Sequence, residues 1–359
     1  MKNKNILELC LSDGLGGLEL FVVSCYENFS QKSRCKVVVA PLSKLDDFLE
    51  SKDKLHIKRN KLFPIIPALK LAKYIDINDI DVIHFHWTKD ILTAVLAKLL
   101  SQKKPKLVQS RHMGMTRFKD DIYHKWLYKN IDMIHAVTYK VKEQLEKFIP
   151  EDVRPKLEMV YLGTKEVKTD KEIVLSLRDK YDLKDEFIVG IVGRIEEGKG
   201  QHKVIEAIKK LEDLNIKAFI VGSAMDDKYL EELKQKAIDL DIKQKIIFTG
   251  FTKNVNEYMH LFDVNILATK NETFGLVVIE AMVNKVSIIA TNNGGPLEII
   301  DDCIDGVLFD GSSQDLANKI QMLSDDQRLK NKLEIAGYNK VMQKFDDTKQ
   351  SDKLYKVII

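Results

Sequence analysis

The chain has 359 residues, which exceeds one typical domain and fits two domains of roughly 150 to 200 residues each. Hydrophobic residues make up 45% of the chain and charged residues 31%, a balance that excludes a disordered protein and provides for a large core. The net charge is +3, no apolar run approaches the ~18 residues of a membrane span, and the four cysteines lack paired or metal-type spacing, so we expect a cytoplasmic protein with reduced thiols.

The N-terminal stretch predicts a buried strand over residues 5–11, a glycine turn and a helix over about 18–29. The turn contains Gly16 and Gly17, which allow the backbone to approach a ligand closely. Glu19 follows in the first helical turn, where a carboxylate complements the helix dipole. A strand, glycine turn and helix are by themselves weak evidence of nucleotide binding.

Four more strands follow, and helical stretches alternate with them. The strands are expected at residues 36–40, 82–85, 106–109 and 133–137. Helices are expected, for example, at 91–100 and 139–148. This alternation predicts a parallel sheet with crossover helices.

Histidines lie near the ends of two of these strands. His84 and His86 share one strand face, and we interpret them as hydrogen-bonded residues rather than metal ligands because no third ligand is evident. His112 directly follows the strand at 106–109, at the sheet edge where parallel sheets present ligands. Arg111 beside it is placed to meet a phosphate or an acidic acceptor.

The charge is unevenly distributed along the chain. Residues 1–165 contain 29 Lys and Arg against 20 Asp and Glu, whereas the remainder contains 28 against 34. The basic excess lies between Lys52 and Lys129, where basic residues mix with apolar ones: Lys58, Arg59, Lys61, Lys70, Lys73, Lys103, Lys104 and Lys106 with Leu62, Phe63, Ile65 and Ile66. Two interpretations stay open, a surface for anionic lipid headgroups or an acidic acceptor, and a solvated lysine-rich face. Nucleic acid is disfavoured because no aromatic platform or binding motif accompanies the charge.

The second half repeats the alternating pattern after a charged linker and helix at 165–184. Strands are expected at 187–192, 217–221, 246–249, 264–268 and 287–290, and the stretch from 326 to 359 is mostly helical. The first of these strands leads into Gly193 and Arg194, with Lys199 five residues after the arginine. Such a cationic pair suits a diphosphate, whose negative charge rises as a glycosidic bond breaks.

The most informative stretch places Glu272 and Glu280 eight residues apart around the turn Phe274, Gly275 and Leu276. A helix predicted over 276–283 begins at the carboxyl end of a buried strand, so its free N–H groups face a ligand above the sheet. Carboxylates only accept hydrogen bonds, and sugars are rich in donors. The stretch therefore predicts a nucleotide-sugar site.

This stretch resembles the donor-site signature of retaining glycosyltransferases of family 4, which reads E-x7-E around F-G-L and continues with G-G-x-x-E. The run from Gly193 to Gly200 is similar to the family's G-R-x4-K-G. The resemblance implies that Glu272 contacts the donor sugar, Glu280 the ribose, and the backbone of Gly275 and Leu276 the diphosphate. It also implies that His112 lies by the donor sugar and the acceptor hydroxyl. The resulting catalytic set is His112, Arg194, Lys199 and Glu272, and the donor-binding set is Gly16, Gly17, Gly193, Phe274, Gly275, Leu276 and Glu280.

The chain departs from the family pattern at two places. Thr273 stands where the family usually has glycine after the first glutamate. Lys285, Val286 and Ser287 stand where it usually has Gly-x-Pro. These departures put the identity of the donor in doubt rather than the site.

The resemblance implies the GT-B fold, an α/β architecture of two Rossmann-like domains facing each other across a cleft. We assign residues 1–165 to an acceptor-binding domain, 166–340 to a nucleotide-sugar-binding domain, and 341–359 to a helix that returns to the first. The implied activity is transfer of a sugar from a UDP- or GDP-sugar, with retention, to a glycan or lipid-linked acceptor in cell-surface polysaccharide synthesis, such as lipopolysaccharide, O-antigen or capsule. No Asp-x-Asp metal signature accompanies the motif, so we expect no metal or other cofactor.

Two alternatives remain, together with the question of membrane contact. A nucleotide-sugar epimerase on the same fold needs no acceptor and typically carries additional acid/base carboxylates. A non-catalytic sugar-nucleotide binding protein would tolerate replacement of Lys199 and Glu272 without loss of activity. Peripheral contact with the inner face of an anionic membrane is an expectation from the basic N-terminal half.

Overall fold

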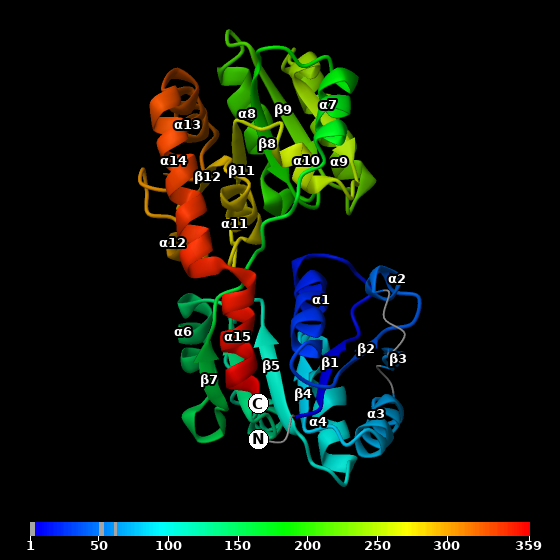
Figure 1. Cartoon of the computed structure of the whole chain (residues 1–359). Coiled ribbons are helices and arrows are strands. Elements are labelled where there is room, and N and C mark those ends of the chain that lie inside the picture. The colour runs from blue at the N-terminus through cyan, green and yellow to red at the C-terminus, as the bar shows by residue number, and fades with distance from the viewer. Residues whose placement is uncertain (1–3, 50–53, 61–62) are drawn as a thin grey trace. The chain divides into compact units, whose positions relative to one another are not determined.

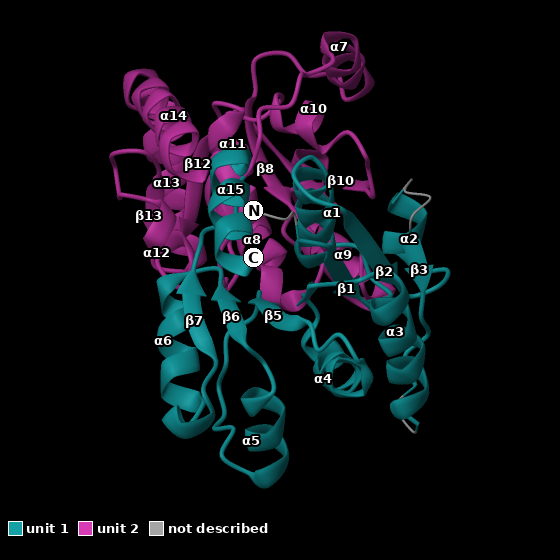
Figure 2. Cartoon of the chain, turned by 60° about the horizontal axis from the view of Figure 1, so that its bottom comes forward, with its two compact units in different colours: residues 1–163, 347–359 teal, residues 164–346 magenta. Residues whose placement is uncertain are grey.

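The computed structural model describes residues 4–49, 54–60 and 63–359. The chain divides into two compact units (Figure 2): unit 1 comprises residues 1–163 and 347–359, and unit 2 comprises residues 164–346. The sequence analysis had placed the first boundary at residue 165 and the start of the terminal segment at 341. Lys52, Lys61 and Leu62, which it assigned to the basic segment, lie outside the described residues.

The described part of unit 1 contains one parallel sheet of seven strands in the order β3-β2-β1-β4-β5-β6-β7 (Figure 1). The strands are β1 (Ile6–Cys10), β2 (Cys35–Val39), β3 (Lys54–His56), β4 (Val82–Phe85), β5 (Lys106–Arg111), β6 (Met133–Ala136) and β7 (Lys156–Met159). The central strands are buried along their whole length because helices cover a parallel sheet on both faces.

The helices of unit 1 connect these strands. They are α1 (Gly17–Ser30), α2 (Lys44–Phe48), α3 (Ile65–Ile77), η1 (Thr88–Asp90), α4 (Ile91–Leu100), α5 (Ile122–Lys129), α6 (Tyr139–Phe148), η2 (Glu151–Val153) and the C-terminal α15 (Asp347–Ile358). Phe29 of α1 and Leu354 of α15 pack in one buried cluster with Ile6, Val82 and Val108 of the sheet. The C-terminal helix therefore belongs to the core of unit 1.

Unit 2 repeats the architecture with six parallel strands in the order β10-β9-β8-β11-β12-β13. The strands are β8 (Phe187–Val192), β9 (Ile216–Val221), β10 (Ile246–Gly250), β11 (Val264–Leu267), β12 (Ser287–Thr291) and β13 (Val307–Phe309). The helices are α7 (Lys171–Lys180), η3 (Glu197–Lys199), α8 (Gln201–Lys210), α9 (Asp227–Asp239), η4 (Lys243–Lys245), α10 (Val255–Met259), α11 (Leu276–Val283), α12 (Pro296–Ile299), α13 (Ser313–Asp325), α14 (Gln327–Lys340) and the π-helix η5 (Val341–Phe345).

The strand orders locate the candidate sites. In unit 1 the chain proceeds from β1 to β2 and β3, then crosses to β4 on the other side of β1. In unit 2 it proceeds from β8 to β9 and β10, then crosses to β11 on the other side of β8. Open parallel sheets bind ligands outside the carboxyl ends of the strands at such a reversal. Ligand sites are therefore expected at the loops that follow β1 and β4, and at those that follow β8 and β11.

The elements named in the sequence analysis are present, and the short strands β3, β7 and β13 are additional. These strands have three or four residues each and lie at or near sheet edges, so they show no long apolar run. Within the described ranges, no helix combines the length and the apolar character that crossing a bilayer requires.

Candidate active site

Arg194 and Lys199 lie in the loop that follows β8. Gly193, with φ of 147°, continues from the strand, and its N–H donates to Val221 O at 2.9 Å. Gln201 at the start of α8 reaches back, and its Nε2 donates to Arg194 O at 2.9 Å. The guanidinium of Arg194 is exposed and lies 3.5 Å from the carboxylate of Glu196. This solvated pair contributes little stability, so Arg194 remains available to an anion.

Lys199 contacts the motif that follows β11, on the neighbouring strand. Its Nζ lies 3.1 Å from Oε2 of Glu272, and both side chains are mostly buried. The other carboxylate oxygen, Oε1, accepts a hydrogen bond from the backbone N–H of Thr273 at 3.1 Å. Glu272 is thereby oriented by one cation and one backbone donor. The ion pair joins the two motifs of unit 2 into one site.

Gly275 begins helix α11 at the carboxyl end of β11. Its φ of 97° lies in the left-handed region, which a residue with a Cβ adopts only at a cost. The first N–H groups of α11 have no partner within the helix and carry its positive dipole end. Phe274 is buried and packs edge-on against Phe345 at 6.0 Å, so its side chain belongs to the core of unit 2. Leu276 is half-buried at the first helical position.

Gly294 and Gly295, which follow β12, pack against the backbone of the loop that contains Glu272. Gly295 N–H donates to Glu272 O at 2.9 Å. A Cβ at Gly294 would lie 2.1 Å from Glu272 O, and a Cβ at Gly295 would lie 2.3 Å from Phe274 Cα. Only glycines allow the two backbones to approach this closely. The pair therefore holds the Glu272 loop in place, a role that the motif resemblance alone does not specify.

Glu280 lies about one turn into α11. Its carboxylate makes neither a hydrogen bond nor an ion pair with the residues that the structure describes, and burial raises its pKa to about 7. A carboxyl held in this way keeps its hydrogen-bonding capacity for a ligand. The ribose hydroxyls implied by the motif resemblance are suitable donors.

Both departures from the family pattern have a structural explanation. Thr273 has no left-handed φ, and it serves Glu272 through its backbone N–H, so no glycine is required there. Lys285 does adopt a left-handed φ of 56°, at the position where the family usually has glycine. Its ammonium lies over the ring of Tyr338, 4.8 Å from the centroid. The protein therefore tolerates a strained backbone at Lys285, and neither departure removes a group from the site.

His112 follows β5 in unit 1 and lies against aromatic rings. It stacks on His86 with centroids 5.8 Å apart, and the ring of Phe21 in α1 meets it edge-on at 5.0 Å. Its Nε2 is buried and has no hydrogen-bond partner among the described residues. Burial and the neighbouring histidines hold the pKa of His112 well below its usual value, so the ring is neutral at pH 7. An unpaired Nε2 on a neutral ring can accept a proton or a hydrogen bond from a substrate hydroxyl.

Helix α1, which begins at Gly17, lies close to His112 because Phe21 lies one turn into that helix. Gly16 precedes the helix with an extended backbone. A Cβ at Gly16 would lie 3.5 Å from Oε2 of Glu19, whose buried carboxylate folds back over the helix start. The positive end of α1 therefore already faces one negative charge, in line with the structural interpretation of Glu19.

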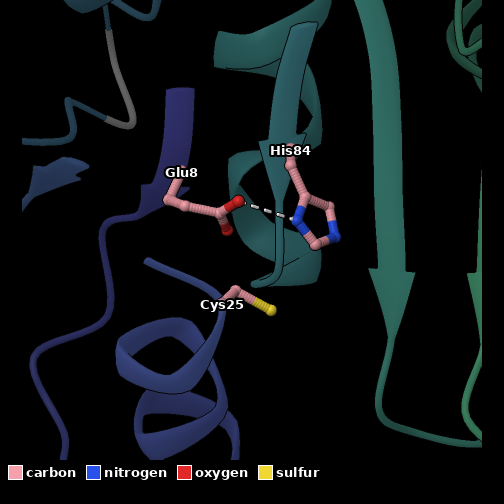
Figure 3. A group of neighbouring side chains, drawn as sticks. All are labelled: Glu8, Cys25 and His84. Atoms are coloured by element: carbon pink, nitrogen blue, oxygen red, sulfur yellow. Dashed lines mark hydrogen bonds and ion pairs between the residues drawn. The ribbon is translucent and has the colours of Figure 1, made fainter. Parts of the chain in front are cut away.

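A buried hydrogen-bond network lies beneath His112 (Figure 3 shows part of it). Glu8 of β1 accepts from His84 Nδ1 at 3.0 Å and from His86 Nε2 at 2.6 Å. His84 Nε2 lies 2.7 Å from Ser110 Oγ, which lies 2.7 Å from His135 Nδ1. His135 Nε2 donates to Val160 O at 2.7 Å. Sequence reasoning missed Glu8, although a single carboxylate within the apolar strand Ile6–Cys10 was an available signal.

Counting protons in this network determines the direction of several of its hydrogen bonds. His135 donates through Nε2, so its neutral ring accepts at Nδ1 from the one Ser110 proton. His84 must then donate to Ser110 through Nε2, and one more proton is shared between its Nδ1 and Glu8. Burial alone would raise the pKa of Glu8, but His84 and His86 lower it to about 2.

Glu8, Cys25 and His84 also offer three metal-ligand atoms within 4.8 Å of one another (Figure 3). Burial raises the pKa of the Cys25 thiol well above its usual value, whereas a metal requires the thiolate. Glu8 and the ring of His84 are already hydrogen-bonded to each other. The donor set therefore fits a hydrogen-bonded core better than a metal centre, as the sequence analysis interpreted His84 and His86.

Two family models match the chain and together span most of it. The model described as Glycosyltransferase Family 4 matches residues 15–164, and the model described as Glycosyl transferases group 1 matches residues 175–340. The chain belongs to this glycosyltransferase family. The prediction made from the motifs is thus confirmed at the level of the family.

The chain is similar to two named bacterial proteins. The glycosyltransferase is 25% identical over 275 residues to N-acetyl-alpha-D-glucosaminyl L-malate synthase of Bacillus anthracis, across 74% of this chain and 71% of the relative. It is 28% identical over 174 residues to the capsular polysaccharide biosynthesis glycosyltransferase CapM of Staphylococcus aureus, across 47% of this chain and 45% of that protein.

Solved structures support the fold. HepE of Anabaena, crystallised with UDP and glucose, superposes with a TM-score of 0.87 over 99% of both chains at 20% identity. A glycosyltransferase from Rickettsia africae superposes with a TM-score of 0.88 over 100% of this chain and 98% of its own, at 22% identity. The glycosyltransferase therefore has the GT-B fold, as the sequence predicted.

The structure brings together the predicted donor-site residues that belong to unit 2. Arg194 and Lys199 follow β8, and Glu272 and Glu280 follow the neighbouring strand β11, with Gly193, Phe274, Gly275 and Leu276 in the same two loops. His112, Gly16 and Gly17 lie in unit 1, at the carboxyl ends of its strands. Gln201 was missed, and its position directly after the G-R-x4-K-G run was the available signal.

Proposed function

We propose that this glycosyltransferase transfers a sugar from a UDP- or GDP-sugar, with retention of configuration and without a metal, to a hydroxyl of a glycan or lipid-linked acceptor. The observation that carries the proposal is the Lys199–Glu272 ion pair of 3.1 Å at the strand-order reversal of unit 2. It combines a cation for a leaving diphosphate with a carboxylate for a sugar hydroxyl. We infer that the product belongs to a cell-surface polysaccharide.

The nucleotide-sugar would be held by positive charge and by free backbone N–H groups. Its diphosphate fits the N-terminus of α11 together with Arg194 and Lys199, because all three supply positive charge on the same sheet edge. Glu272 would accept from the sugar, and Glu280 from the ribose. Lys199 would exchange its contact with Glu272 for one with the diphosphate as negative charge develops there.

The cationic pair can take over the charge stabilisation that a divalent metal supplies in other transferases. Neither Glu272, held by Lys199, nor Glu280, inside a helix, is evidently placed for a double displacement. The family resemblance supports attack from the face of the leaving group, with a diphosphate oxygen taking the acceptor proton. Neutral His112 would then meet the acceptor hydroxyl or the donor sugar.

The relatives support both halves of the proposal. HepE of Anabaena has been crystallised with UDP and with UDP-glucose, which favours a UDP-sugar donor. CapM of Staphylococcus aureus is named for capsule synthesis, and LpsE of Rhizobium meliloti for lipopolysaccharide core synthesis. A polysaccharide acceptor fits these names better than a small soluble one, although the malate synthase shows that the family also includes the latter.

The deciding experiment is isothermal titration of the purified protein with UDP, GDP and ADP in the presence of EDTA. One nucleotide should bind, and Arg194→Ala and Glu280→Ala should each weaken it by about tenfold, as expected for the loss of one charge-assisted contact. Lys210→Ala, an exposed lysine at the end of α8, is the control. If all three nucleotides fail to bind with or without Mg²⁺, the donor site is wrong. Binding that requires Mg²⁺ would overturn only the metal-free part.

A further inference from the structure

Unit 1 contains a cavity of about 380 Å³ that the donor site does not use. It lies between the segment after β3, the start of α4, the end of β5 and helix α5. Five basic side chains line it: Arg59, Lys89, Arg111, Lys119 and His124. No carboxylate lines it among the residues that the structure describes. The cavity is therefore suited to an anion.

The guanidinium of Arg111 has no carboxylate partner among the residues that the structure describes. The side chain is only 8% exposed, and its guanidinium donates to Met113 O at 2.7 Å, Thr88 Oγ1 at 3.0 Å and Gly114 O at 3.2 Å. All three acceptors are neutral, and no described carboxylate forms an ion pair with it. A buried cation without a counter-charge is costly, and burial accordingly lowers the pKa of Arg111. An anion in the cavity would supply the missing charge.

Two acidic residues that are close to lining residues in the chain have other partners or little charge. Asp121 is bound to Nδ1 of His124 and caps the start of α5. Asp90 accepts from Leu11 N at 2.8 Å, and burial raises its pKa to about 7, so it carries only part of a charge at neutral pH. The cavity therefore keeps a net positive charge.

Exposed apolar side chains lie near two of the lining residues in the chain. Pro64 and Tyr123 line the cavity, and exposed apolar residues adjoin both of them in the chain. At the start of α3 these are Phe63, Ile65, Ile66 and Leu69, and on α5 they are Ile122, which is 90% exposed, and Trp126. Exposed apolar groups beside a basic cavity match a ligand with a charged head and a hydrocarbon tail.

We propose that the cavity binds the phosphate group of a lipid-linked acceptor, with the apolar side chains of α3 and α5 receiving its hydrocarbon chain. The inference rests on the proposed transferase function and names its acceptor class. A phosphate provides more negative charge and more acceptor oxygens than one carboxylate, and Arg111 presents planar donors that suit it. Arg59 and Lys89 lie over the ring of Trp87, 4.6 and 4.9 Å from its centroid, which places both cations at one wall.

Tryptophan fluorescence provides a direct assay, because the chain contains only two tryptophans and both are in unit 1. Trp87 contacts the basic wall, and Trp126 lies on α5. The wild-type protein would be titrated with farnesyl phosphate, farnesol, glucose 1-phosphate and inorganic phosphate, below the concentrations at which the lipids form micelles. Farnesyl phosphate should bind most tightly, because it alone presents both the charge and the chain.

The double variant Lys89→Ala/Lys119→Ala removes two lining charges that are not buried in the core. It should weaken farnesyl phosphate binding by about tenfold or more, as expected when two charge-assisted contacts are lost. The matched control Lys44→Ala/Lys129→Ala removes two exposed charges of the same unit outside the cavity, and it should bind as the wild type does.

Three results would overturn the proposal: farnesol binding as tightly as farnesyl phosphate, both double variants losing affinity equally, or glucose 1-phosphate binding more tightly than farnesyl phosphate. The last would assign the cavity to a soluble phosphorylated acceptor. Calorimetry with UDP and GDP on the same preparations separates the two proposals. If the wild type bound neither UDP nor GDP, the donor site proposed in unit 2 would be contradicted. The result for farnesyl phosphate binding in unit 1 would not be affected.

Discussion

Two charged residues of the proposed donor site, Lys199 and Glu280, differ in whether the folded protein provides them with a partner. Lys199 is balanced by Glu272, and this balance holds both groups in place before any donor binds. Glu280 has no such partner, and its ionised form is disfavoured by burial. A group that the folded protein leaves unpaired is available to a ligand at the expense of stability. Replacing Lys199 should therefore change the transfer rate, and replacing Glu280 should change the pH dependence of stability.

Replacing Lys199 by alanine should lower kcat/KM by about 10² to 10³-fold, the usual effect of removing one preorganised group that stabilises a developing charge. The measurement is the initial transfer rate with the identified donor. The control Lys210→Ala changes an exposed lysine at the far end of α8, the helix that follows this loop, so its rate should stay near that of the wild type. A rate for Lys199→Ala within twofold of that control would exclude a catalytic role for the ammonium.

Replacing Glu280 by glutamine should stabilise the protein at alkaline pH. The pKa of Glu280 is about 7 in the folded state and near 4.5 when unfolded, so folding costs free energy as pH rises through this interval. Above pH 7 the cost is fully present and amounts to as much as about 3 kcal/mol. Urea unfolding at pH 5 and pH 8 measures it. The gain should be small at pH 5 and largest at pH 8, and an equal gain at both would contradict the assigned shift.

Glycines at the ends of elements determine how close the loops of unit 2 come to one another. Gly275 starts α11 with a left-handed φ, and Gly294 and Gly295 lie against the backbone of Glu272 and Phe274. Lys285 lies in the middle of the connection from α11 to β12 and has a left-handed φ of its own. Loop geometry here depends on backbone conformations that most residues adopt at a cost of roughly 1–2 kcal/mol.

Lys285→Gly should therefore be more stable than Lys285→Ala by about 1 kcal/mol, because both variants lose the contact with Tyr338 and only glycine relieves the backbone. The free energy of unfolding in urea is the quantity to compare. The alanine variant serves as the control for the lost side chain. If alanine were the more stable of the two, the left-handed backbone would not be the source of strain.

At the scale of the whole molecule, the two units differ in how they bury charge. Unit 1 encloses Glu8 with His84, and it keeps His86, His112 and His135 neutral. Fewer of the buried polar residues of unit 2 are titratable; they are Glu257, Asp305 and Lys330. Acid should therefore act first on unit 1.

The stability of unit 1 should fall as pH drops from about 6.5 to about 4. Burial lowers the pKa of His86 to about 4 and that of His135 to about 3, whereas unfolded histidine titrates near 6.5. The unfolded state binds protons first in this interval, so unfolding is favoured as acid is added. The tryptophans, both in unit 1, report its unfolding in urea at each pH.

The variant His86→Gln, which keeps a donor toward Glu8, should flatten this pH dependence because one of the buried neutral imidazoles is gone. Lys44→Ala in the same unit changes an exposed charge and should leave the slope as it is. A wild-type tryptophan transition that did not move between pH 7 and pH 5 would contradict the neutral state assigned to His86 and His135.

The sequence by itself determined the elements and the family, and it supplied most residues of the proposed donor site. Apolar strands, glycine turns and helical spacing are local patterns, and the motifs around Arg194, Lys199 and Glu272 extend over a few residues each. Only the tertiary structure decided which charges meet. Lys199 and Glu272 are 73 residues apart, and Glu8 and His84 are 76 apart. Neighbouring strands of a parallel sheet come from distant parts of the chain, so the strand order brings such pairs into contact. The same strand order brings together the residues that line the basic cavity around Arg111.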